Sequence, residues 1–192
     1  MKTRWIAFLV MLSIITSGMC QSLEMSQIVN ADKNWGQEFI AFPVDWASEM
    51  TLQGYEELRF APQRSNPEHE QFWSLLMAWK VDATVPLSLE TIEQSFYHYF
   101  DALMKPNHWA QEFPAPTLSF QATETNHYSG RMQLFDGFYT GTVINLNIEG
   151  SQHFCTVQEK TIVLFRISPQ PFESDIWQTM RNFSLQPHAC NP

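Results

Sequence analysis

Glycine, charged residues and repeats are scarce in this sequence. Only seven of its 192 residues are glycine and only 16% are charged, which excludes a linker-rich or disordered polymer. The chain also has no internal repeat, no low-complexity tract and no obvious linker to a second domain. Hydrophobic residues make up 44% of it, with fifteen Phe and seven Trp, so we expect a compact fold whose core is filled by large rings.

Signatures of catalysis and of cofactor binding are absent as well. The sequence has no G-x-S-x-G elbow, no H-E-x-x-H pair, no glycine-rich phosphate loop and no C-x-x-C. We therefore expect no cofactor, no metal site and a non-catalytic binding or envelope-associated role. Because a triad needs no local signature, an exported hydrolase with a site assembled from separated residues is the alternative. Its candidate residues are Glu57, Arg59, His127 and Asp136.

Positive charge is sparse and scattered. Beyond the N-terminus, Lys and Arg occur singly, at positions 33, 59, 64, 80, 105, 131, 160, 166 and 181, and the formal net charge is −9. An acidic chain without a basic cluster repels phosphate backbones and anionic membrane surfaces. The sequence therefore predicts that nucleic acids are not partners of this protein.

The N-terminus carries the one long apolar run. MKTR supplies two positive charges, residues 5–15 are apolar, and the following TSGMCQS is small and polar, which is the order of a secretory signal peptide. A run of about eleven residues is short of the roughly twenty that span a bilayer as a helix. We expect residues 1–20 to be a signal peptide, the exported protein to be periplasmic or secreted, and no membrane span to remain after cleavage.

Cys20 raises a minor alternative, in which a lipid on this cysteine anchors the protein. Such a site usually has a small residue directly before the cysteine and an aliphatic one three positions before it. This chain has Met19 and Ser17 there, and Met19 would fill a pocket built for Gly or Ala. A soluble exported protein is therefore the favoured interpretation.

Two segments have the spacing of amphipathic helices, with apolar residues three and four positions apart. The first helix is expected over 88–105, where Ser88 can cap it and Pro106 stops it. The second is expected over 172–183, near the C-terminus. Both apolar stripes are interpreted as core rather than as contacts to a cofactor.

Most of the remaining chain alternates with a period of two residues, as half-buried strands do. The run TIVLFRI is apolar on both faces except at Arg166, as expected of a central strand. Polar segments at 124–130 and 149–152 are interpreted as hairpin turns. The pattern predicts an α+β fold, an antiparallel β-sheet packed against the two helices. We expect a loose lead-in over 21–36 and a single globular domain over 37–192.

Two His-x-Cys pairs are the most distinctive constellation, His153 with Cys155 and His188 with Cys190. The four residues could nominally form a Cys2His2 zinc site, but two strand residues separated by one lie about 6.5 Å apart, which is tight for two ligands of one ion. Signal removal would leave two cysteines in an oxidising compartment, where cysteines tend to pair. We therefore expect a Cys155–Cys190 disulfide, with a metal site or free thiols as the alternatives.

Acidic neighbours occur at Glu56 and Glu57 and again at Glu68 and Glu70. Paired carboxylates can share acid and base roles in glycoside hydrolysis. Adjacent residues on a strand, however, point to opposite faces and do not oppose each other across a substrate. We expect both pairs to lie on a solvated surface.

Four aromatic residues fall in or near expected loops rather than in the periodic stripes. Exposed rings of this kind could stack on a sugar or grip a peptide, so a peptide or carbohydrate ligand is a candidate partner. Loop aromatics more often cover the edge of a small core, which is the favoured interpretation. These candidate ligand-contact residues are Trp35, Trp46, Trp109 and Tyr128.

Several blocks of the chain resemble a family of exported bacterial proteins of unknown function. The blocks are GYEELRFAPQ, FWSLLMAWKVD, YFDALM and FRISPQPFESDIWQTM, with Cys190 following the last helix. In the family pattern a G-x-E-x-[IL]-R-F-A-P segment precedes a Trp-rich strand; this chain departs from it at Gln63, where Gly is expected. The resemblance implies export but supplies no catalytic residues. The layout is also similar to α+β sheets of the PsbP/Mog1 type, an analogy of fold alone.

Overall fold

The computed structural model describes residues 25–105 and 113–191. Seven strands form an antiparallel sheet in the order β2-β3-β4-β8-β7-β6-β5, and two very short strands, β1 and β9, pair separately. The strands of the large sheet are β2 (Gly36–Phe42), β3 (Gly54–Phe60), β4 (Leu75–Asp82), β5 (Thr117–Glu124), β6 (His127–Phe135), β7 (Val143–Cys155) and β8 (Lys160–Ser168). The short pair consists of β1 (Val29–Asn30) and β9 (Ser184–Leu185), and the helices are α1 (Leu89–Met104) and α2 (Asp175–Asn182).

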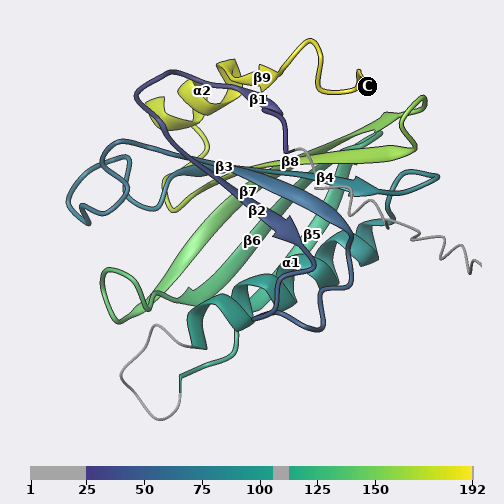
Figure 1. The fold of residues 1–192 in the computed structure, drawn as a ribbon. Helices are drawn as coiled ribbons and strands as arrows, with labels where there is room; N and C mark the ends of the chain where they lie inside the picture. Colours follow the sequence, from purple (N-terminus) through teal and green to yellow (C-terminus); the bar gives the residue numbers. More distant parts are fainter. Residues whose placement is uncertain (1–24, 106–112, 192) are drawn as a thin grey trace, which may run out of the picture.

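The sheet is covered on both faces, as Figure 1 shows. Helix α1 lies across one face, while α2 and the β1–β9 pair lie on the other. Two separate hydrophobic clusters fill these layers, one on each side of the sheet. The predicted α+β class, an antiparallel sheet with two helices, is therefore what the structure has, although sheet dominates it.

Alternation along the strands assigns their side chains to the two layers. On β4, Leu75, Met77 and Trp79 join the cluster under α1, whereas Leu76 and Ala78 join the cluster under α2. Strand β8 is apolar on both faces because it is central, lying between β4 and β7, which confirms its predicted place.

Both predicted helices exist, with shorter bounds. Helix α1 begins after Ser88, whose Oγ accepts a hydrogen bond from the backbone N–H of Thr91 at 3.1 Å, so the predicted cap is confirmed. Helix α2 covers Asp175–Asn182 rather than 172–183. It starts later because the Ser174 hydroxyl donates to the Pro171 carbonyl at 2.7 Å, which holds the preceding residues in a turn.

The predicted turn at 149–152 is wrong. Strand β7 continues through this segment, and its turn follows at 156–159, where Gln158 N–H donates to the Cys155 carbonyl at 3.1 Å. Gly150 lies in the middle of the strand because neighbouring rings need the space. A Cβ there would come within 3.1 Å of the Tyr128 side chain and 3.4 Å of Phe165. The other predicted turn, at 124–130, is confined to the two residues between β5 and β6.

The expectation of a loose lead-in over 21–36 is also wrong for its described part. Ile28 and Val29 are fully buried, and β1 pairs with β9 near the opposite end of the chain. The Glu57 carboxylate accepts hydrogen bonds from the backbone N–H groups of both residues. The segment therefore completes the layer under α2. Residues 1–20, Cys20 and Trp109 lie outside the described residues.

No helix among the described residues is both long enough and apolar enough to cross a membrane.

Candidate functional site

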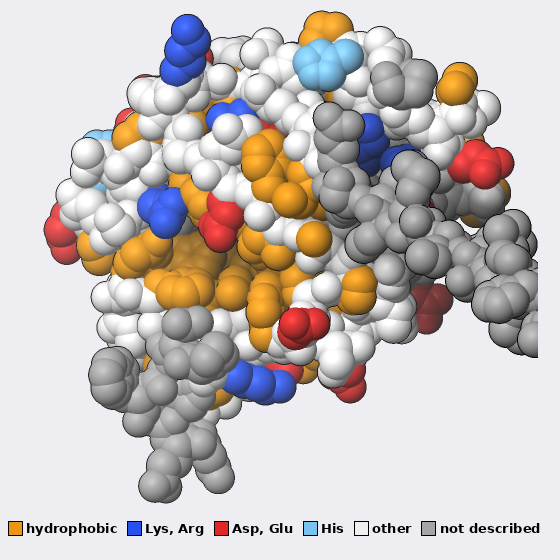
Figure 2. Space-filling model, viewed as in Figure 1, with side chains coloured by type: hydrophobic (Ala, Val, Ile, Leu, Met, Phe, Trp, Pro, Cys, Tyr) orange, Lys and Arg blue, Asp and Glu red, His pale blue; other side chains and the backbone are white. Residues whose placement is uncertain are grey.

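An apolar cavity of about 320 Å³ lies between helix α1 and the edge of the sheet that carries β2, β3 and β4. Figure 2 shows hydrophobic side chains gathered in a hollow at this position, with charged side chains at its margin. The sheet wall consists of Ile40, Leu58, Phe60, Leu75 and Met77, and the helix wall of Tyr99, Phe100 and Leu103. A second hollow, over β5, β6 and β7, is lined mostly by polar residues.

The walls follow directly from strand and helix geometry. Leu58 and Met77 are direct partners in the β3–β4 register, so their side chains lie side by side on one face. Tyr99 and Leu103 are four residues apart on α1 and therefore share one side of the helix. The volume falls at the lower end of the range of roughly 300–1,000 Å³ that is typical of small-molecule pockets.

An aromatic loop forms one border of the cavity. Phe138 and Tyr139 line it from the turn between β6 and β7 and are 43% and 36% exposed. The buried Asp136 carboxylate holds this turn by accepting hydrogen bonds from the backbone N–H groups of Phe138 at 3.0 Å, Tyr139 at 3.2 Å and Thr140 at 2.9 Å. Gly141 adopts the left-handed conformation (φ +64°) that closes the turn.

Trp73 lies behind this loop. Its φ of +51° is a conformation that a bulky residue rarely adopts, and its ring packs 6.1 Å from that of Phe138 and 6.2 Å from that of Tyr139. The buried indole N–H has no hydrogen-bond acceptor among the described residues. A buried donor without a partner is costly, so an acceptor delivered to this corner would be stabilising.

Two charged residues line the cavity, Glu38 and Arg64. The Arg64 guanidinium lies 3.7 Å from the centroid of the Phe60 ring, and its Nε donates to the Tyr139 hydroxyl at 3.0 Å. Glu38 is exposed on edge strand β2, opposite Leu58.

A buried carboxyl group, that of Glu56, contacts the helix wall through Tyr99. Glu56 is fully buried and accepts hydrogen bonds from the Tyr99 hydroxyl at 2.5 Å and from the Trp79 indole N–H at 3.2 Å. Burial raises the pKa of Glu56 from 4.5 to about 8, so the group is mostly protonated at neutral pH. Burial and the neighbouring Glu56 raise the pKa of Tyr99 well above 10, so its hydroxyl keeps its proton.

The acidic pairs divide between two environments. The expectation that Glu56 and Glu57 lie on a solvated surface is wrong, because both are fully buried, one on each face of β3. Their opposite orientation, by contrast, is as expected. Glu68 and Glu70 are exposed in a turn segment, which confirms their prediction.

Of the four residues suggested for a hydrolase, the structure brings only Glu57 and Arg59 into contact. Glu57 and Arg59 form a buried ion pair at 2.6 Å on the α2 side of β3. His127 begins strand β6, whereas Asp136 follows its other end. Asp136 and Glu57 each have structural partners that account for their burial.

Three of the four candidate ligand-contact aromatics, Trp35, Trp46 and Tyr128, lie among the described residues. Trp35 and Tyr128 are buried, at 4% and 6% exposure, as rings that cover the core are. Trp35 packs edge-on against Phe183 at 5.0 Å. Trp46 is 39% exposed and packs 4.9 Å from Tyr99, which lines the cavity. Of the four, it alone among the described residues lies beside the site.

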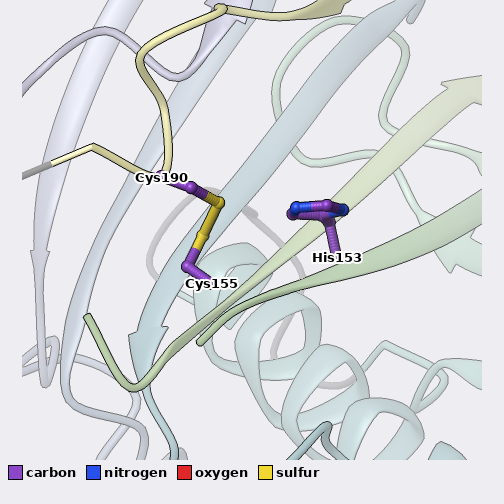
Figure 3. A group of neighbouring side chains, drawn as sticks. All are labelled: His153, Cys155 and Cys190. Atoms are coloured by element: carbon purple, nitrogen blue, oxygen red, sulfur yellow. A yellow bond between two sulfur atoms is a disulfide. The ribbon is translucent and has the colours of Figure 1, made fainter. Parts of the chain in front are cut away.

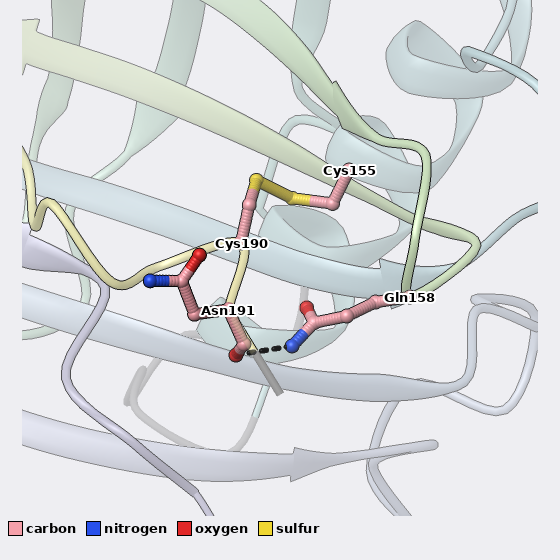
Figure 4. The surroundings of a disulfide bond; sticks show 4 residues. All are labelled: Cys155, Gln158, Cys190 and Asn191. Carbon is pink, nitrogen blue, oxygen red and sulfur yellow. Dashed lines mark hydrogen bonds between the residues drawn. A yellow bond between two sulfur atoms is a disulfide. The ribbon is translucent and has the colours of Figure 1, made fainter.

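Cys155 and Cys190 are joined by a disulfide, with their Cα atoms 5.1 Å apart. Figure 3 shows His153 beside the bond, and donor atoms of the three residues lie within 4.8 Å of one another. Sulfurs bonded to each other cannot act as thiolate ligands, so in this state His153 is the sole free donor of that group. The disulfide holds the tail against the β7–β8 turn, where Gln158 Nε2 donates to the Asn191 carbonyl (Figure 4).

The residues that border the cavity were not predicted from the sequence. Phe138 and Tyr139 are adjacent aromatics in DGFYTG, a turn-like segment, and this was the available signal for exposed rings. Arg64 and Glu38 carry no local pattern, because the fold alone brings them to one cavity.

Comparison of the chain with models of known families, with curated proteins and with solved structures found no match.

Proposed function

We propose that this protein is an exported, non-catalytic binding domain that takes a small apolar ligand into the cavity between α1 and the β2–β4 edge of the sheet. The observation that carries the proposal is the cavity itself, whose described lining consists of aliphatic and aromatic side chains with only two charged residues, Glu38 and Arg64. Pockets of this composition are the usual sites for small molecules.

The packing around the cavity supports a ligand rather than a defect of the core. Protein interiors are close-packed, and an unfilled cavity reduces stability in proportion to its volume. Here the aromatic border of the cavity is held by specific contacts. The Asp136 carboxylate is buried, and it accepts hydrogen bonds from the backbone N–H groups of Phe138 and Tyr139. If this region served only as core, larger side chains could have filled the space.

Binding without catalysis fits the polar groups of the site. A hydrolase would need a nucleophile beside a base near the bound substrate. The described lining offers no Ser, Cys or His, and the Tyr99 hydroxyl is already engaged by Glu56. A sugar-stacking role for Trp35 or Tyr128 is disfavoured by their burial.

The proposal is tested by filling the cavity. We expect the neutral fluorophore N-phenyl-1-naphthylamine to bind the full exported chain with a rise in emission. Ile40→Trp, which extends a half-buried lining residue into the space, should weaken this binding by about tenfold or more. Ala41→Trp is the matched control, because Ala41 is its exposed neighbour on the same strand and does not line the cavity.

Two results would contradict the proposal. One is the absence of saturable binding by the folded wild-type chain. The other is equal affinity of Ile40→Trp, Ala41→Trp and wild type, which would place the fluorophore elsewhere on the protein.

A further inference from the structure

We infer that the ligand is an amphipathic organic anion, whose acidic group is bound by Arg64 while its apolar body lies between α1 and the sheet. This inference rests on the proposed function and names the class of ligand for that site.

Arg64 is held in position before any ligand arrives. Its guanidinium lies over the Phe60 ring at 3.7 Å, its Nε donates to Tyr139, and its backbone carbonyl accepts from the Trp73 N–H at 3.0 Å. The side chain has five N–H donors, and among the described residues only Nε has a partner. The two terminal amino groups are thus available, in the fork geometry that suits a carboxylate.

The strand residue beside the Arg64 guanidinium is a glycine. Gly36 lies next to the terminal amino groups, and a Cβ built on it would be 3.8 Å from the Arg64 Nη1 atom. The position opposite Phe60 on β2 therefore carries no side chain that would cover the guanidinium. Because Arg64 also lines the cavity, an acidic head group bound there would meet its guanidinium.

The charge of Arg64 is uncompensated in an acidic protein. Arg59 pairs with Glu57 and Arg181 with Glu149, but no acid lies within ion-pair distance of Arg64 among the described residues. A half-buried cation against apolar rings loses part of its hydration, and a bound anion restores charge-assisted hydrogen bonds. Arg64 is also the sole cation of the described lining.

Glu38 determines which end of the ligand lies at Arg64. It is exposed, and it lies two residues along β2 from Gly36, on the part of the strand that leads to Ile40. Its carboxylate repels an acidic head from that part of the cavity, so the head is directed to Arg64 and the apolar body to Ile40 and Leu103.

Three probes with alkyl chains of the same length separate the effect of head-group charge from that of hydrophobicity. Decanoate, decanol and decylammonium are titrated into the full chain loaded with N-phenyl-1-naphthylamine, and displacement is measured. Wild type should bind decanoate about tenfold more tightly than decanol, and decylammonium more weakly than either. Arg64→Met should remove the preference for decanoate and leave decanol unchanged.

Two further variants control the interpretation. Arg131→Met removes an exposed positive charge that does not line the cavity, and its decanoate affinity should match that of wild type. Glu38→Gln removes the repulsive carboxylate and should strengthen decanoate binding a few-fold. Circular dichroism of each variant, with unchanged decanol binding, shows that the fold and the cavity persist.

The outcomes are distinct for the two proposals. Displacement by none of the probes would contradict the proposed function itself. Equal displacement by all three, unchanged by Arg64→Met, would overturn the inference and leave the binding function standing. Preference for decylammonium that disappears in Glu38→Gln would reverse the charge of the ligand and overturn the inference as well.

Discussion

Glu56 and Glu57, adjacent on strand β3, have opposite roles because they face opposite layers. Glu57 acts as an anchor, accepting hydrogen bonds from Arg59, Gln37 and the backbone N–H groups of Ile28 and Val29. Glu56 accepts hydrogen bonds only from the Tyr99 hydroxyl and the Trp79 indole N–H. Among the described residues no cation lies within ion-pair distance of it. Burial without a counter-charge favours its protonated form.

The pH dependence of stability should therefore carry a signature of Glu56. Below about pH 4.5 this group is protonated in both the folded and unfolded chain and contributes no slope. Between 4.5 and about 8 the unfolded chain releases the proton while the folded chain keeps it, so the free energy of unfolding falls as pH rises. The contribution approaches about 1.4 kcal/mol per pH unit for one whole proton, and it levels off above pH 8.

Glu56→Gln isolates this contribution. Urea unfolding of wild type and variant, measured from pH 5 to 9, should show the variant gaining stability relative to wild type as pH rises. Glu68→Gln, at an exposed turn position, should show no such gain. If the difference in the free energy of unfolding between wild type and Glu56→Gln does not change with pH, the buried carboxyl is not protonated as described.

At the scale of single residues, sequence reasoning succeeded where a local rule decides and failed where tertiary contacts decide. Ser88 was identifiable as a cap because capping depends on its immediate neighbours. Trp35 and Tyr128 were candidates for ligand contact because their segments lack periodicity, yet distant partners bury them: Phe183 packs against Trp35, and Gly150 leaves room for Tyr128. Burial of Glu57 was equally hidden, since the segment that covers it, with its partners Ile28 and Val29, lies 28 to 29 residues away in sequence.

At the scale of elements, the two ends of the described chain meet on one face of the sheet. Strand β1 pairs with β9, and α2 is fixed by Arg166, which donates to the carbonyls of Met180 at 2.8 Å and Phe183 at 3.0 Å. The disulfide then ties Cys190 to the end of β7. Each of these short elements is too small to be stable alone, so the layer depends on their mutual contacts.

Removal of the disulfide should weaken this layer substantially. The bond joins residues 35 apart, and the loop-closure model assigns about 4 kcal/mol to an interval of that length. A Cys155→Ala/Cys190→Ala double variant should therefore unfold at a clearly lower urea concentration than wild type. Titration of the unreduced wild-type protein with a thiol reagent should detect neither Cys155 nor Cys190.

The contrary results are equally clear. Two reactive thiols in the unreduced protein, with zinc bound by His153, Cys155, His188 and Cys190, would restore the metal interpretation. An unchanged unfolding midpoint of the double variant would remove the stabilising role of the bond.

At the scale of the whole molecule, the spacing of apolar residues was enough to predict an antiparallel sheet with two helices, because alternation marks the strands and a spacing of three and four residues marks the helices. The cavity was not predictable in this way. Its walls come from β2, β3, β4, α1 and the β6–β7 turn, and only the folded arrangement brings Glu38, Arg64 and Tyr139 to one place. Its apolar lining looks like ordinary core in the sequence, since a strand that faces a ligand has the same alternation as one that faces a helix.

The central claim is that the cavity under α1 binds the apolar part of a ligand, and methyl NMR of the full chain during titration with decanoate tests it most directly. The methyl signals of Ile40, Leu58 and Leu103, which line the cavity, should shift and saturate together. Those of Leu76 and Ile176, in the layer under α2, should stay unchanged. Shifts confined to the α2 layer, or no shift at concentrations that saturate fluorophore displacement, would contradict the account.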